Sequence, residues 1–240
     1  MKKLFAPFVT AILIGAGIVT ASNMTQVSVK AADTAGKITV SGMGAVNAKP
    51  DIAYISIGYT NQNADSKTAQ SLNNAQMEKI IAAVKSLNIA DKDIQTTQFS
   101  MYPQTDYNNN NRITGYSVTN MIRVTVRKLD QAGDVVDKAI DAGANAGGDI
   151  QFAIADPSPY YEQAMGLAIE NANAKASAIA DAIHVTIGKP SEITEMGSMY
   201  TPVLYGNANA VPMADRAGSG TPVQSGDLSV SANIQVVFQY

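Results

Sequence analysis

Apolar and polar residues alternate along several stretches of the chain, and this period of two predicts half-buried β-strands. The sequence Lys49-Pro50-Asp51 interrupts the alternation after the first stretch, so we expect a short loop between the first two strands. The predicted strands cover residues 38–47, 53–60, 94–102, 116–127, 150–155, 188–196 and 228–238.

A period close to 3.6 residues replaces the alternation in other segments and predicts amphipathic helices. These segments are 65–88, 130–142 and 158–183. In the first of them, the expected apolar face consists of Ala69, Leu72, Met77, Ile80, Val84 and Leu87. In the third of them, the apolar residues recur at intervals of four and three, which places them on one side of a helix. We therefore expect its buried face to consist of Met165, Ile169, Ala172, Ala176, Ile179 and Ile183.

The expected helix starts carry residues that favour this position. Asp65 or Ser66, Asp130 and Ser158 have side chains that accept hydrogen bonds from free backbone N–H groups at a helix start. Pro159 follows Ser158, and proline suits the first helical position because its missing N–H costs nothing there.

The predicted elements follow the order β-β-α-β-β-α-β-α-β-β. Alternation on one side of each strand favours a largely antiparallel sheet with helices packed on one face, and hence the α+β class. Residues 197–226 show no periodicity and are rich in Gly, Pro, Ser, Asn and Ala. We expect this segment to be a mobile loop within a domain spanning 36–240, because the last strand is too short to fold alone.

The first residues have the composition of an export signal. Lys2 and Lys3 precede an almost uncharged run over residues 4–21, and small polar residues follow up to Ala31. This order predicts a secretory signal peptide over residues 1–31, with cleavage near Ala31 and, as a second choice, after Ala21. The alternative is an uncleaved N-terminal membrane tether, because the apolar run approaches the length of a minimal spanning helix.

Composition limits the classes of function. The chain has 240 residues and no cysteine, so disulfides, thiolate nucleophiles, thiolate metal sites and a lipid-modified cysteine anchor are all excluded. Removing Lys2, Lys3 and Lys30 with the signal peptide changes the formal charge from −3 to −6. Such an acidic chain with scattered basic residues argues against nucleic acid as a partner.

Short motifs in a fixed order make the chain resemble the SIMPL domain family over residues 36–240. They are Ile38-Thr39-Val40-Ser41-Gly42 leading to Lys49-Pro50-Asp51, Ile113-Thr114-Gly115-Tyr116, Phe152 before the alanine-rich helix, and residues 222–226 before the last strand. The resemblance implies an extracytoplasmic α+β domain, a link to oxidative or envelope stress, and no established enzyme activity. It supplies no catalytic residues and no cofactor. His184 departs from the family, which tends to have a glycine at the end of this helix.

Three methionines are the candidate metal ligands. Met196, Met199 and Met213 lie in or beside the segment 197–226, where their thioethers can bind Cu(I) or undergo reversible oxidation. Methionine is also a common apolar filler, so the alternative is simple packing. His184 is the only histidine, which excludes a site built from several histidines within one chain.

Other residue groups have simpler interpretations. We interpret Gly143, Gly147 and Gly148 as a turn that ends a helix, because no phosphate-binding pattern follows them. The glycines at 42 and 44 indicate a bulge or a close backbone approach. We expect Asp51, Asp156 and Asp227 to accept hydrogen bonds in turns. Tyrosines near loops offer either packing or contact surface; they are Tyr102, Tyr107, Tyr160, Tyr161, Tyr200 and Tyr205.

These observations lead to three hypotheses. The first is an exported, non-enzymatic protein that forms homo-oligomers through a polar sheet face with few charges, associates with the cell envelope and protects it under stress. The second is a small-ligand or copper-binding module that uses the Met- and Tyr-containing loop. The third is a hydrolase, which requires an acid/base cluster that the linear sequence does not show.

Overall fold

The computed structural model describes residues 36–107, 110–197 and 221–240. The predicted signal peptide and most of the predicted loop 197–226 therefore lie outside the described residues. Within the described ranges, no helix is both long enough and apolar enough to cross a membrane.

All strand pairs are antiparallel, which confirms the α+β class predicted from the alternation. The strands are β1 (Lys37–Ala48), β2 (Ile52–Asn63), β3 (Ile94–Asp106), β4 (Arg112–Val126), β5 (Ala146–Ala153), β6 (Glu192–Glu195) and β7 (Leu228–Gln239). The α-helices are α1 (Ser66–Lys85), α2 (Ala132–Asp141) and α3 (Ser158–Ala182), and short 3₁₀ helices cover Asp91–Asp93 and Leu129–Gln131.

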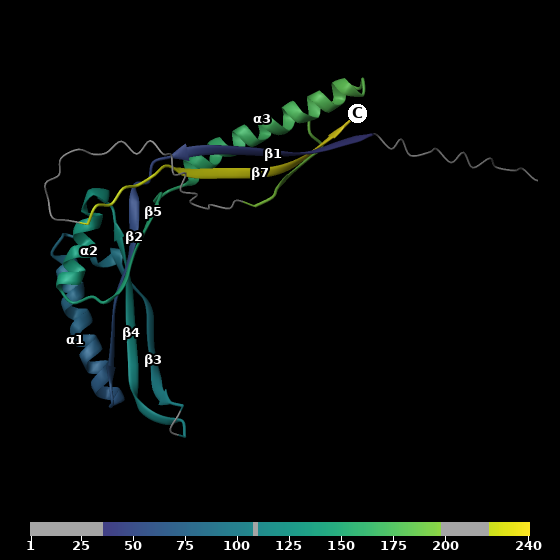
Figure 1. Cartoon of the computed structure of the whole chain (residues 1–240). Helices are drawn as coiled ribbons and strands as arrows, with labels where there is room; N and C mark the ends of the chain where they lie inside the picture. Colours follow the sequence, from purple (N-terminus) through teal and green to yellow (C-terminus); the bar gives the residue numbers. More distant parts are fainter. Residues whose placement is uncertain (1–35, 108–109, 198–220) are drawn as a thin grey trace, which may run out of the picture. The chain divides into compact units, whose positions relative to one another are not determined.

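The strands form two sheets, whereas the sequence predicted one. The larger sheet has four strands in the order β3-β4-β2-β5, and α1 and α2 pack on the same face of it (Figure 1). Its core combines apolar side chains of β2, β4 and the two helices, including Ile55, Ile57, Ile122, Val124, Met77, Ile80, Val84 and Val135.

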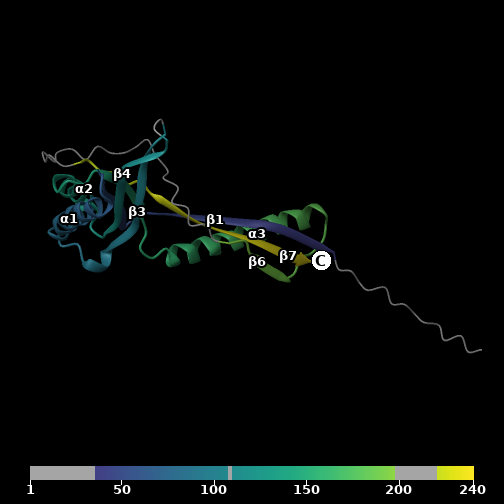
Figure 2. The ribbon, with the colours of Figure 1, turned by 90° about the horizontal axis from the view of Figure 1, so that it is seen from below.

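The smaller sheet has three strands in the order β1-β7-β6. Strands β1 and β7 pair along their whole length, from Lys37 opposite Gln239 to Ala48 opposite Leu228. The first and last strands of the described chain therefore hold each other. Helix α3 lies along this pair in both views (Figures 1 and 2).

The buried face of α3 agrees with the predicted one at Ala172 and Ala176, and Met165 and Ile169 are partly buried against the same core, but the rest of the face differs. The residues with least exposure are alanines spaced by exactly four positions, namely Ala164, Ala168, Ala172, Ala176 and Ala180. Ile179 and Ile183, which the sequence placed on the buried face, are 41% and 47% exposed. The helical period finds the mean apolar direction, but only small side chains fit along the row that the β1 backbone approaches closely.

Glycines in β1 explain why alanines, and no larger residues, form the buried row of α3. A Cβ on Gly42 would lie 2.1 Å from the Ala168 carbonyl oxygen, and one on Gly44 would lie 2.0 Å from that of Ala164. The backbones of β1 and α3 thus approach each other closely, as the sequence predicted for these glycines. The approach lies within one chain and involves no bulge between β1 and β7.

The free edge of β1 is partly covered by polar side chains of α3. The Met43 backbone N–H donates to Asn171 Oδ1 at 3.2 Å, and Lys175 Nζ donates to the Ser41 carbonyl oxygen at 2.8 Å. An outer strand with unpaired backbone groups is a template for strand addition, so these contacts protect the middle of the edge.

Asp51 fixes the loop that connects the two sheets. Its backbone N–H donates to the Ala153 carbonyl oxygen at 3.1 Å, and its carboxylate accepts from the Ala155 N–H at 2.7 Å. The preceding Pro50 is buried. This confirms the short loop between the first two strands and the predicted acceptor role of Asp51.

Two of the predicted helix starts need correction. Asp65 caps α1 as predicted, because its carboxylate accepts from the Thr68 N–H at 2.8 Å. Asp130 instead lies in the 3₁₀ helix before α2 and makes no capping hydrogen bond to it. Ser158 is the first residue of α3 rather than its cap, and its N–H donates to the Asp156 carboxylate at 3.0 Å.

Candidate functional site

The face of the four-stranded sheet opposite α1 and α2 is not part of the helix–sheet core. Successive side chains of a strand point alternately to the core face and to this face, so the pairing register identifies the residues that lie here. They include Gln95, Gln98, Ser100, Tyr102 and Gln104 of β3, Ser117, Thr119, Met121, Arg123 and Thr125 of β4, and Tyr54, Ser56, Gly58, Thr60 and Gln62 of β2. We call this surface the open face.

The open face is polar but nearly uncharged. Among its residues on β2, β3 and β4, Arg123 is the only charged one, and its guanidinium lies 5.5 Å from the centroid of the Tyr54 ring. The hydroxyls of Thr60 and Thr119 are hydrogen-bonded across the strands at 2.9 Å. The surface can therefore accept and donate hydrogen bonds, and burying it costs less than burying charged groups, but its residues on β2, β3 and β4 include no carboxylate pair for acid/base chemistry.

Exposed tyrosines lie at one end of this surface. Tyr102 on β3 and Tyr107 just after it are 66% and 83% exposed. In contrast, Tyr160 and Tyr161 pack against a small core, and the Tyr161 hydroxyl donates to Glu195 Oε1 at 2.5 Å. Tyr200 and Tyr205 lie outside the described residues.

The methionine candidates are only partly described. Met196 directly follows β6 and is 60% exposed, while Met199 and Met213 lie outside the described residues. In the described part of the chain, no group of three or more His, Cys, Asp or Glu residues is placed to hold a metal ion.

Gly143 ends α2, as the sequence predicted. It has a positive φ of 95°, and the N–H groups of Gly143 and Ala144 donate to the carbonyl oxygens of Ile140 and Ala139. Gly147 and Gly148 instead lie in β5, where the register shifts opposite Ile55 and Ile57, so they form a bulge.

His184 ends α3 in the same way, although it is not a glycine. Its φ is 56°, its N–H donates to the Asp181 carbonyl oxygen, and the Val185 N–H donates to that of Ala180. These two hydrogen bonds define the usual glycine-type helix end. The non-glycine residue put the usual helix-ending geometry in doubt. The helix nevertheless ends with that geometry, and His184 adopts the left-handed backbone conformation.

Hydrogen bonds reach Asp156, a carboxylate that the sequence assigned to a turn, and Asp137, to which the sequence gave no such role. Those from Ser158 lower the pKa of Asp156 below its ordinary value, because they stabilise the charged form. Hydrogen bonds from Thr221 lower the pKa of Asp137 in the same way. The strongest contribution comes from the Thr221 hydroxyl, which donates to the Asp137 carboxylate at 2.6 Å. Asp227 is exposed, and no contact of it bears on its predicted role.

Sequence periodicity missed a buried asparagine. Asn73 on α1 is 0% exposed, and its Nδ2 lies 3.0 Å from the Tyr59 carbonyl oxygen and 3.0 Å from Asn61 Oδ1. Leu72, which the period placed on the buried face, is exposed instead. The sequence signal that could have indicated this buried residue is Asn73 directly after Leu72, an expected core residue.

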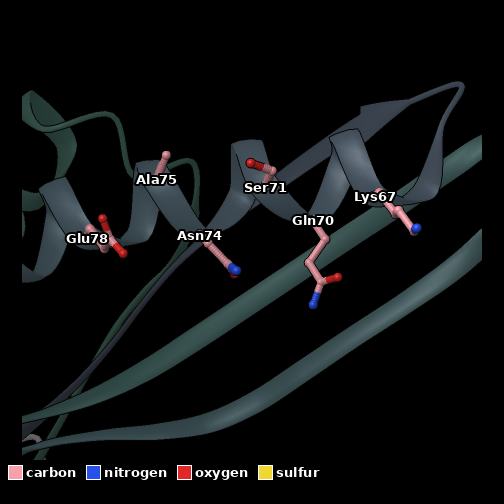
Figure 3. Close-up of a pocket in the computed structure, with 6 residues that line it drawn as sticks. All are labelled: Lys67, Gln70, Ser71, Asn74, Ala75 and Glu78. Atoms are coloured by element: carbon pink, nitrogen blue, oxygen red, sulfur yellow. The ribbon is translucent and has the colours of Figure 1, made fainter.

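A shallow hollow runs along the exposed side of α1 (Figure 3). Lys67, Gln70, Asn74 and Glu78 project from one side of the helix there, while Ala75 points away from them. None of these side chains is buried, so the hollow does not shield a reacting group from water.

Comparison with known proteins gives a family match over most of the chain. The SIMPL family pattern, described as a protein of unknown function (DUF541), matches residues 38–238. The chain belongs to the SIMPL family. The match begins in β1 and ends in β7, so a SIMPL domain here comprises both sheets.

Two relatives match most of the chain and most of their own length. The 26 kDa periplasmic immunogenic protein of Brucella melitensis is 32% identical over 98% of this chain and 96% of its own length. The uncharacterized protein YggE of Escherichia coli K12 is 30% identical over 84% of this chain and 82% of its own length.

Proposed function

We propose that this SIMPL protein is an exported, non-enzymatic protein that self-associates through its open face and protects the cell envelope under oxidative stress. Export is supported by the composition of residues 1–31 and by the Brucella relative, whose name places that protein in the periplasm. The protein acts in this setting by binding and assembly rather than by catalysis.

The open face is the observation that carries this proposal. Two sheets that meet face to face bury side chains such as Thr119 and Met121, and hydroxyls can pair with hydroxyls of the other copy. A single cation, Arg123, gives little charge repulsion between copies. The exposed Tyr102 adds an aromatic contact at the edge of the same surface.

Light scattering at several protein concentrations tests the self-association. We expect the mass of the purified protein to exceed that of one chain at micromolar concentration. Thr119→Arg places a second positive charge beside Arg123 on the open face, so we expect it to shift the protein toward monomer. Asn74→Arg adds the same charge on exposed α1 and serves as the matched control.

Two outcomes would contradict this proposal. A strict monomer across the micromolar range removes self-association, and an unchanged mass in Thr119→Arg removes the open face as its surface. Separately, cell fractionation with sequencing of the mature N-terminus checks export, and we expect a chain that begins at Ala32.

A second candidate function is a small-ligand or copper-binding module. The exposure of Met196 favours this function. Met196 follows β6, is 60% exposed and does not belong to the core cluster of the three-stranded sheet. Exposed thioethers are typical ligands of Cu(I).

A further inference from the structure

A second exposed methionine lies on the same row of the three-stranded sheet as Met196. Met43 of β1 is the partner of Asn233 on β7. On the other side of β7, the Met196 N–H donates to the Asn233 carbonyl oxygen at 2.9 Å, which continues the β6–β7 ladder by one residue. Met43 and Met196 are separated by 153 positions in the sequence numbering and by one strand in the sheet.

Both methionine side chains lie on the face of this sheet that α3 leaves uncovered. On β1, Gly42 and Gly44 face α3, so Met43 between them faces away. On β7, Ile234 faces the core and Asn233 does not. Met196 continues the alternation in which Thr194 shares the side of Gln235.

Their exposure argues against a packing role. Met43 is 63% exposed and Met196 is 60% exposed. Methionine fills gaps in cores because it is apolar and flexible, and that explanation requires burial. Two exposed thioethers on either side of one asparagine therefore need another explanation.

We propose that Met43 and Met196 form a binding site for a monovalent soft metal ion, Cu(I) in the cell, with the Asn233 side chain beneath it. This inference rests on the second candidate function and names its ligands. Neighbouring strands lie about 4.8 Å apart, so the two Cα atoms are about 10 Å apart, a span that two methionine side chains can close from both sides.

The surroundings select a soft ion. The adjacent rows contain Ser41, Gln235 and Thr194 on one side and Ala45 and Ser231 on the other, all uncharged. Mg²⁺ and Ca²⁺ require carboxylate oxygens, which these rows do not supply. Thioethers bind Cu(I) and its analogue Ag(I) without a change in protonation.

Titration of the purified chain with Ag(I), a probe that does not change oxidation state, tests the site. With isotope-labelled methionine methyl groups, we expect the signals of Met43 and Met196 to shift together as one ion binds. Met43→Leu keeps the apolar volume but removes one thioether, so we expect binding to weaken by about tenfold or more. Repeating the titration with Cu(I) under reducing conditions checks the cellular ion.

Matched variants separate this site from the loop methionines. Met101→Leu removes a thioether from β3 of the other sheet, on the face opposite the open face, and we expect no change in affinity. Loss of binding in Met199→Leu/Met213→Leu but not in Met43→Leu would overturn the sheet site while keeping a metal-binding loop. Unchanged binding in all of these variants, or no binding by the unmodified protein, would overturn both.

Discussion

Asn73 and His184 occupy positions that their side chains do not ordinarily favour. Asn73 is buried in the helix–sheet interface, where its Oδ1 has no hydrogen-bond partner among the described residues. His184 has a positive φ of 56°, a region that costs residues with a Cβ about 1 kcal/mol or more. Hydropathy and periodicity predict neither position. Asn73 depends on a neighbouring strand, and His184 depends on backbone geometry.

Replacing His184 with glycine should stabilise the protein. We expect His184→Gly to raise the free energy of unfolding by about 1 kcal/mol, because glycine adopts positive φ without strain. Chemical denaturation measures the change. Gly143→Ala is the inverse control at the corresponding position of α2, and it should destabilise the protein. A lower stability for His184→Gly would show that the imidazole makes a compensating contact.

At the scale of elements, α3 packs on β1 through small residues on both sides. The alanines spaced by four and the glycines of β1 bring the two backbones together, so large side chains such as Ile179 stay outside the core. The sequence predicted the helix and its length well, since both depend on local period. It could not predict which row of the helix is buried, because that depends on the close approach of a distant strand, β1.

Adding one methyl group to this interface should therefore be costly. In Gly42→Ala, the new Cβ would lie 2.1 Å from the Ala168 carbonyl oxygen, so α3 must move away from β1. We expect a loss of about 1–3 kcal/mol, the usual cost of overpacking. Gly166→Ala is the matched control, because nothing lies within 4 Å of its Cβ and alanine favours a helix. An equally stable Gly42→Ala would refute the close packing.

At the scale of the whole domain, residues far apart in the sequence tie the last strand to the larger sheet. Before entering β7, the chain passes α2, where the Thr221 N–H and hydroxyl donate to the Asp137 carboxylate. Gly133 leaves room for this segment, since a Cβ there would lie 2.4 Å from the Thr221 carbonyl oxygen. Val223 then packs against the core of the four-stranded sheet.

The Asp137 contact should make stability depend on acid pH. Its pKa is lower in the folded protein than the ordinary 3.8, so the contact stabilises the fold above that pH. Its contribution is lost as pH falls through the lower folded pKa. We expect Asp137→Asn to lower the melting temperature at neutral pH, and the difference from the unmodified protein to disappear in strong acid. Asp141→Asn, which removes an exposed carboxylate of the same helix, controls for the loss of one negative charge.

The sequence by itself determined the type and approximate position of each element, because alternation and helical period are local properties of neighbouring residues. It also determined the absence of cysteine chemistry and the composition of an export signal over residues 1–31. Only the tertiary structure decided that β1 pairs with β7, that the strands form two sheets, and that Met43 lies one strand from Met196. Strand partners are chosen by contacts between distant segments, and a local pattern carries no information about which distant segment wins.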